Sequence, residues 1–94
     1  MQDDAIDRLL DELYAEGQRS GGMWNVGPDG GALLAWLVGL LGARRVLEVG
    51  ASNGYSAIWM ARALAATGGT LVTLERDPAK IALARANIDR AGHA

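Results

Sequence analysis

The chain has 94 residues, which allows one domain at most, and half of them are apolar, which excludes a disordered chain. It has no cysteine, so disulfides and cysteine-ligated metal sites are excluded. With a net charge of −2, scattered basic residues, an acidic start and no apolar run long enough to span a bilayer, we predict a cytoplasmic protein that binds neither nucleic acid nor membrane.

The first third of the chain predicts two helices. Residues 4–16 carry apolar residues at helical spacing, and Gly17 is expected to end this helix. Residues 18–27 are rich in glycine and are expected to be irregular. A second helix begins at Pro28 and ends before Gly42. Its apolar stripe, of the kind that normally faces a core, consists of Leu33, Leu34, Leu37, Leu40 and Leu41.

A β-α-β unit follows. Residues 45–49 suit a strand buried on both faces of a parallel sheet, residues 55–66 form a third helix, and residues 70–74 form a second strand. A fourth helix, with Asp77 as its N-cap, ends before Gly92. The order is α-α-β-α-β-α, so we predict an α/β fold with a right-handed parallel crossover.

A doubly wound sheet would require a third strand after Gly92. Two parallel strands by themselves leave unpaired edges and uncovered apolar faces. We therefore expect the 94 residues to be the front part of a larger domain. A sheet edge completed by another chain and a small independent unit of low stability are the alternatives.

The turn after the first strand has the features of a ligand site. A strand, a glycine-rich turn and a helix N-terminus bring backbone close to a ligand. Gly50 would let the chain turn with an unusual φ, and Gly54 would remove a Cβ that blocks the ligand's approach. Glu75 ends the second strand, where a carboxylate can accept two hydrogen bonds from a ribose diol. Together these residues predict half of a nucleoside-binding site.

Residues 47–56 resemble the first motif of class I S-adenosylmethionine-dependent methyltransferases, in particular the O-methyltransferases related to the caffeoyl-CoA and catechol enzymes. Residues 25–31 and 74–78 are also similar to that family. The shared pattern of an acidic residue, two spaced glycines, an aromatic residue and serine is carried here by Glu48, Gly50, Gly54, Tyr55 and Ser56.

The resemblance implies a Rossmann-like class I methyltransferase fold, truncated before its third strand. Residues 1–94 would then be the N-terminal part of one S-adenosylmethionine-binding domain. Residues 1–22 would form its N-terminal helix and loop, and residues 23–94 its cofactor-binding core.

The resemblance also implies a role for individual residues toward S-adenosylmethionine. Glu48 would hold the methionine amino group and Ser56 the methionine carboxylate, near a helix N-terminus that favours an anion. Gly50 and Ala51 would pass beneath the ligand, Glu75 would bind the ribose, and Arg76 would flank the adenine. The implied cofactor-binding residues are Val26, Glu48, Gly50, Ala51, Ser52, Gly54, Tyr55, Ser56, Glu75 and Arg76.

The implied reaction is methyl transfer to a hydroxyl of a small molecule. In that family the divalent-metal ligands and the acceptor-positioning residues lie after the third and fourth strands. We therefore assign no catalytic residue and no metal ligand, and we expect little or no turnover from residues 1–94 alone. A homo-oligomer or a completing chain at the open sheet edge is compatible with this interpretation.

The sequence is also compatible with other interpretations. The chain could be a non-catalytic cofactor-binding or interaction module completed by a partner chain, or the glycine turn could be purely structural. A nicotinamide-dependent oxidoreductase is disfavoured because Gly-x-Gly-x-x-Gly would require glycine where Ser52 stands. Trp36 and Trp59 are expected to pack in the core or at an interface, Trp24 to border a ligand or a core, and His93 to be solvated.

Overall fold

The computed structural model describes residues 3–20 and 25–93. In chain order it contains α1 (Asp3–Ser20), α2 (Gly27–Leu40), β1 (Arg45–Val49), α3 (Tyr55–Ala65), β2 (Thr70–Leu74) and α4 (Pro78–Arg90). The predicted order and type of these elements are confirmed. The prediction for Trp24 concerns a residue outside the described ranges.

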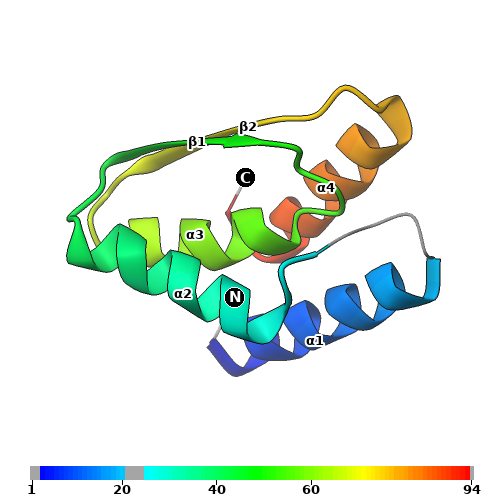
Figure 1. Cartoon of the computed structure of the whole chain (residues 1–94), viewed down its shortest axis with the longest axis horizontal. Helices are drawn as coiled ribbons and strands as arrows, with labels where there is room; N and C mark the ends of the chain where they lie inside the picture. Colours follow the sequence, from blue (N-terminus) through cyan, green and yellow to red (C-terminus); the bar gives the residue numbers. More distant parts are fainter. Residues whose placement is uncertain (1–2, 21–24, 94) are drawn as a thin grey trace.

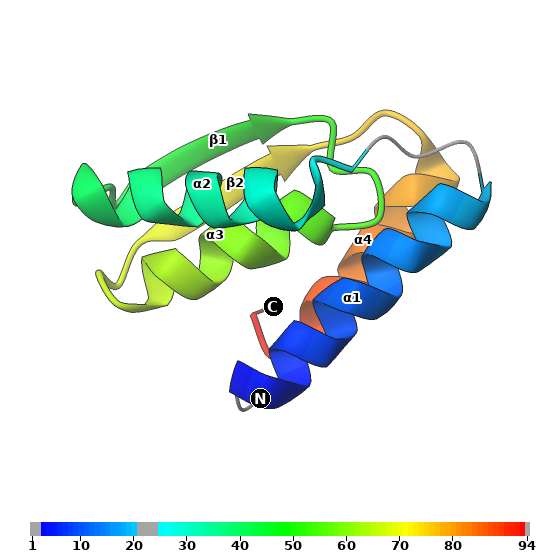
Figure 2. The ribbon, with the colours of Figure 1, turned by 60° about the horizontal axis from the view of Figure 1, so that its bottom comes forward.

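The two strands form a parallel sheet, with Arg45 opposite Thr70 and Val49 opposite Leu74. In Figures 1 and 2, α2 and α3 lie along one face of this sheet, and α1 and α4 lie side by side beyond α3. Side chains alternate between the helix side and the outer side, because successive strand residues point to opposite faces. The outer face carries exposed Leu47, Val49, Val72 and Leu74.

The expectation that residues 45–49 are buried on both faces was therefore wrong for the part of the chain that the structure describes. Val49, for example, is 80% exposed. The physical reason is that no described element packs on the outer side of the sheet, whereas parallel sheets are normally covered on both faces.

Helix α3 lies between two apolar clusters. One joins it to α1 and α4 and consists of Ile6, Leu9, Leu10, Leu13, Tyr55, Ile58 and Ala91. The other joins it to α2 and the sheet around Val38, Met60 and Leu64. Two exposed ion pairs of 2.7 Å, Arg62–Asp7 and Arg90–Glu12, connect α1 with α3 and α4.

Helix α1 continues past the residue that was expected to end it. Gly17 is buried inside α1, which extends to Ser20, and the Gln18 side chain donates a 2.8 Å hydrogen bond to the Tyr14 hydroxyl one turn earlier. A glycine can end a helix, but a helix can also continue through a glycine. Local pattern alone could not distinguish these outcomes.

Most of the predicted apolar stripe of α2 is exposed, although Leu34 is partly buried against the cluster around Val38. Leu33, Leu37, Leu40 and Leu41 are exposed, and so is Trp36 at 61%, which rules out a core position for Trp36 and leaves its expected place at an interface as a prediction. Helix α2 packs on α3 through Leu34 and Val38, and it also approaches closely at Gly31, where an added Cβ would lie 2.3 Å from the Trp59 ring. No helix in residues 3–20 or 25–93 is both long and apolar enough to cross a membrane.

Candidate functional site

The turn between β1 and α3 begins at Gly50, which has a φ of 90°. Its backbone amide donates a 2.7 Å hydrogen bond to the Leu74 carbonyl and so extends the ladder between the strands. A Cβ added to Gly50 would meet no atom within 4 Å. The predicted unusual φ is confirmed, and the backbone at Gly50 borders open space that a ligand can occupy.

Gly54 has a different role from the one expected. Its φ is 91°, but an added Cβ would lie 3.3 Å from the Ala84 carbonyl oxygen on α4. Glycine suits this position because of its positive φ and because α4 packs close to it, so Gly54 does not provide the clearance for a ligand that was expected.

A buried asparagine anchors the same turn, and sequence reasoning missed it. The Asn53 side chain donates a 3.0 Å hydrogen bond to the Leu13 carbonyl and accepts one of 3.2 Å from the Tyr55 amide. The Asn53 carbonyl accepts a 2.9 Å hydrogen bond from the side chain of Asn87. Buried polar groups need such partners, so α1 and α4 hold the turn in place.

The Glu48 carboxylate faces the helix side of the sheet, where it accepts two hydrogen bonds. The Thr73 hydroxyl donates to Oε1 at 2.7 Å, and the Ser56 hydroxyl donates to Oε2. Ser56 lies in the first turn of α3, where the helix dipole also favours negative charge. Sequence reasoning missed Thr73, although the strand register that places it opposite Glu48 is a signal that could have identified it.

The Glu75 carboxylate, directly after β2, is hydrogen-bonded to the turn that follows β1. It accepts a 2.9 Å hydrogen bond from the Ser52 amide on Oε1 and a 3.2 Å bond from the Asp77 amide on Oε2. These backbone donors, that of Ser52 foremost, lower the pKa of Glu75 below its ordinary value. Glu75 is therefore an ionised acceptor at neutral pH.

Two hollows meet at this turn. The first, called here the Glu48 hollow, has a volume of about 330 Å³. It is lined by Asn25, Val26, Glu48, Gly50, Ser52 and Ser56, together with the apolar Leu34, Leu47, Val49 and Met60. The second, the Glu75 hollow, has a volume of about 480 Å³ and is lined by Val49, Gly50, Leu74, Glu75 and Arg76. Because Val49 and Gly50 belong to both, a single elongated ligand can lie across Gly50 with one end in each hollow.

The Glu48 hollow also has unsatisfied polar groups. The side-chain nitrogen of Asn25 and the hydroxyl of Ser52 are buried without a hydrogen-bond partner among the described residues. Unpaired buried polar atoms are costly, and a polar ligand would satisfy them.

Most of the residues that the sequence predicted for this site surround the two hollows. Val26, Glu48, Gly50, Ser52 and Ser56 line the first, and Glu75 and Arg76 line the second. Ala51 borders a smaller hollow that also contains Glu75. Gly54 and Tyr55 are the exceptions. Gly54 packs against α4, and the Tyr55 side chain is 1% exposed with its ring against Tyr14 at 5.7 Å, so the ring is not available to a ligand.

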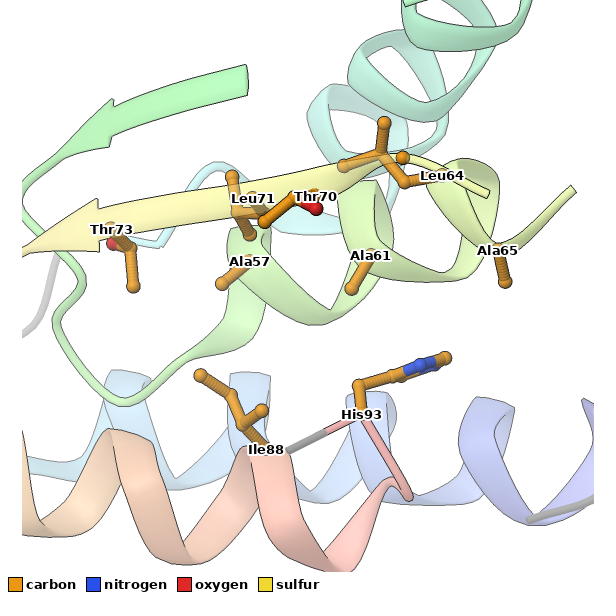
Figure 3. Close-up of a pocket in the computed structure, with 10 residues that line it drawn as sticks. Ala57, Ala61, Leu64, Ala65, Thr70, Leu71, Thr73, Ile88 and His93 are labelled. Atoms are coloured by element: carbon orange, nitrogen blue, oxygen red, sulfur yellow. The ribbon is translucent and has the colours of Figure 1, made fainter. Parts of the chain in front are cut away.

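A separate cavity of about 430 Å³ lies between α3, β2 and α4 (Figure 3). It is lined largely by small and apolar residues, with His93 at one end. His93 is partly buried, contrary to its expected solvation, and burial lowers its pKa. The cavity has no acidic lining residue, and the described part of the chain has no group of three or more residues suited to hold a metal ion.

Comparison with known proteins assigns the chain to a family. Residues 3–94 match the O-methyltransferase family. The chain belongs to this family. It is 44% identical over 91 residues to the catechol O-methyltransferase of Niastella koreensis, a match that covers 97% of this chain and 39% of that protein.

Solved members of the family have the same fold. An O-methyltransferase from Bacillus cereus in complex with SAH superimposes with a TM-score of 0.77 and 38% identity, covering 98% of this chain and 40% of that one. The O-methyltransferase TomG from Streptomyces achromogenes in complex with SAM gives a TM-score of 0.78 and 35% identity, covering 100% and 40%. The Rossmann-like class I methyltransferase fold is thereby confirmed, and the chain spans less than half the length of these relatives.

Proposed function

We propose that the chain forms the cofactor-binding part of an S-adenosylmethionine-dependent O-methyltransferase. The observation that carries this proposal is the meeting of the Glu48 and Glu75 hollows at Gly50. S-adenosylmethionine has an amino acid at one end and a nucleoside at the other, and each hollow offers a carboxylate suited to one end. The solved relatives that bind SAH or SAM support the same ligand.

The residues present fit this cofactor chemically. In the Glu48 hollow, Glu48 suits the ammonium group, and Ser56 at the start of α3 suits the carboxylate. In the Glu75 hollow, the carboxylate still has acceptor capacity for a ribose diol, because two oxygens offer about four lone-pair positions and two backbone amides occupy only part of it. Arg76 lines the same hollow and would flank the adenine.

The cofactor would supply an electrophilic methyl group on its sulfonium. The contribution of this chain is to bind the cofactor and fix its orientation, which is a large part of what a displacement at carbon requires. The acceptor would be a hydroxyl of a small molecule. Methyl transfer to it would be the activity of a protein of the full length of these relatives, of which this chain spans about 40%. A cytoplasmic location remains part of this proposal.

The outer face of the sheet supports a further part of the proposal. Leu47, Val49, Val72 and Leu74 expose apolar surface on neighbouring strands. Parallel sheets are stable when both faces are covered. We therefore propose that this face packs against additional polypeptide, either in the same protein or in a partner chain, and a homo-oligomer is one form that this would take.

Titration calorimetry with S-adenosylhomocysteine tests the proposed cofactor site. The parent chain is expected to bind, and Gly50→Val is expected to weaken binding by at least about ten-fold, since the side chain would fill the junction of the two hollows. Gly68→Val is the matched control. Gly68 also has a positive φ of 72° and no atom within 4 Å of an added Cβ, but it lies in the turn between α3 and β2.

Circular dichroism would show whether each variant retains its helices. Retained helical content with loss of binding in Gly50→Val alone supports the proposal. Equal affinity of the two variants for S-adenosylhomocysteine would contradict it.

A further inference from the structure

The hydrogen bond between Thr73 and Glu48 indicates how the Glu48 carboxylate is positioned before a ligand binds. We propose that Thr73 is a positioning residue, which fixes the Glu48 carboxylate for the amino group of the ligand. The inference rests on the proposed function and adds to it a residue outside the recognised motif.

The placement of Thr73 is set by the sheet. Thr73 stands directly opposite Glu48 in the register of β2 and β1, and its hydroxyl donates a 2.7 Å hydrogen bond to Glu48 Oε1. Both side chains lie on the helix side of the sheet, and Figure 3 shows the Thr73 side chain extending to that side of β2. The strand ladder therefore fixes the distance between the two side chains without help from a mobile loop.

The second donor to Glu48 is differently placed. Ser56 donates to Oε2, and its side chain belongs to the Glu48 hollow itself. A serine hydroxyl has one hydrogen to donate. When the carboxylate of a bound ligand takes that hydrogen, Ser56 no longer restrains Glu48.

Thr73 does not line the Glu48 hollow, so a ligand there does not compete for its hydroxyl. The Thr73 hydroxyl remains hydrogen-bonded to Glu48 Oε1, while Glu48 Oε2 becomes free to accept from the ligand's ammonium group. A glutamate side chain has several rotatable bonds, and restraining it before binding removes part of the entropy cost of association. Ligand binding thus replaces the hydrogen bond from Ser56 to Glu48, whereas the hydrogen bond from Thr73 is kept.

The test uses the full chain and two ligands that differ in one part. S-adenosylhomocysteine has the amino-acid end, whereas 5′-methylthioadenosine lacks it. Thr73→Val removes the hydroxyl but keeps the size and the strand preference of the side chain. We expect Thr73→Val to weaken S-adenosylhomocysteine binding by on the order of ten-fold, the typical effect of losing a hydrogen bond to a charged group, and to leave 5′-methylthioadenosine binding unchanged.

NMR titration measures the binding of both ligands, including weak binding. Two variants act as controls in these titrations. Thr73→Ser keeps a hydroxyl and is expected to restore most of the affinity. Thr70→Val makes the same change at the far end of β2, opposite Arg45, and is expected to bind both ligands like the parent.

A double-mutant cycle with Glu48→Gln decides whether Thr73 acts through Glu48. We expect Thr73→Val to have little further effect on S-adenosylhomocysteine binding once Glu48 is replaced. The inference is overturned if Thr73→Val binds S-adenosylhomocysteine like the parent, if it weakens both ligands equally, or if its effect is undiminished beside Glu48→Gln. Failure of the parent chain to bind either ligand would contradict the proposed function and, with it, this inference.

Discussion

The backbone amide of Ser52 donates a 2.9 Å hydrogen bond to the carboxylate of Glu75, which stands 23 residues later in the chain. This bond joins the turn after β1 to the end of β2. It places the two parts of the predicted nucleoside site at the same edge of the sheet, as parallel strands do with their carboxyl ends.

Glu75→Ala is expected to weaken S-adenosylhomocysteine binding by about ten-fold or more. The variant loses a charged acceptor for the ribose and also frees the Ser52 amide that orients the turn. Asp89→Ala, which removes an exposed acidic residue of α4, is the control. Calorimetry that gives Glu75→Ala the affinity of the parent would refute the ribose role.

The stability of the chain should depend on the ionisation of Glu75. The Ser52 and Asp77 amides lower its folded-state pKa below the ordinary value of 4.5. A lowered acid pKa stabilises the folded state above the unfolded-state pKa, and this stabilisation is lost as the pH falls through the folded-state value.

Denaturant unfolding of the parent and of Glu75→Gln would measure this dependence. The difference in the free energy of unfolding should be largest near neutral pH and should shrink below about pH 4.5, where the parent carboxylate becomes protonated. A difference that stays constant with pH would show that the two amides do not favour the charged form.

Two glycine-to-alanine changes on α2 should have opposite effects on stability. Gly31→Ala places a Cβ 2.3 Å from the Trp59 ring, and overpacking of this kind costs about 1–3 kcal/mol. Gly39→Ala meets no atom within 4 Å and should stabilise the helix by up to about 1 kcal/mol. Thermal or denaturant unfolding of both variants would check the signs, and stabilisation by both would contradict the close contact of α2 with Trp59.

Asn87→Ala should loosen the turn after β1. The change leaves the Asn53 carbonyl without its 2.9 Å donor, at a cost of about 1–3 kcal/mol for a buried unsatisfied group. Chemical denaturation measures this loss, and Asp89→Ala, on the exposed side of the same helix, should change stability little. Equal effects of the two variants would indicate that the Asn87 hydrogen bond adds nothing specific.

Several features of the site and its surroundings could be predicted from the sequence alone. Asp77 accepts a 3.0 Å hydrogen bond from the Ala79 amide as the predicted N-cap of α4, and Gly50 has the predicted positive φ. Capping and left-handed backbone depend on a few neighbouring residues, so their signals are present in a short stretch of sequence.

Other parts depend on which elements face one another. The α2 leucine stripe predicted a buried face, yet most of it is exposed, and Gly31, Leu34 and Val38 contribute the contact with the rest of the fold. Gly54 was assigned to ligand clearance, whereas its missing Cβ makes room for α4. Periodicity shows that a face is apolar, but it does not show what covers that face.

The order of strands and helices, the left-handed turn at Gly50 and the acids at both strand ends are properties of the sequence by itself, because each arises from local chemistry. Only the tertiary structure decided that Thr73 and Ser56 share Glu48, that Asn53 is buried between α1 and α4, and that Glu75 binds the Ser52 amide. These contacts join residues far apart in the chain, and their distances are set by strand register and helix packing, which no short stretch of sequence encodes.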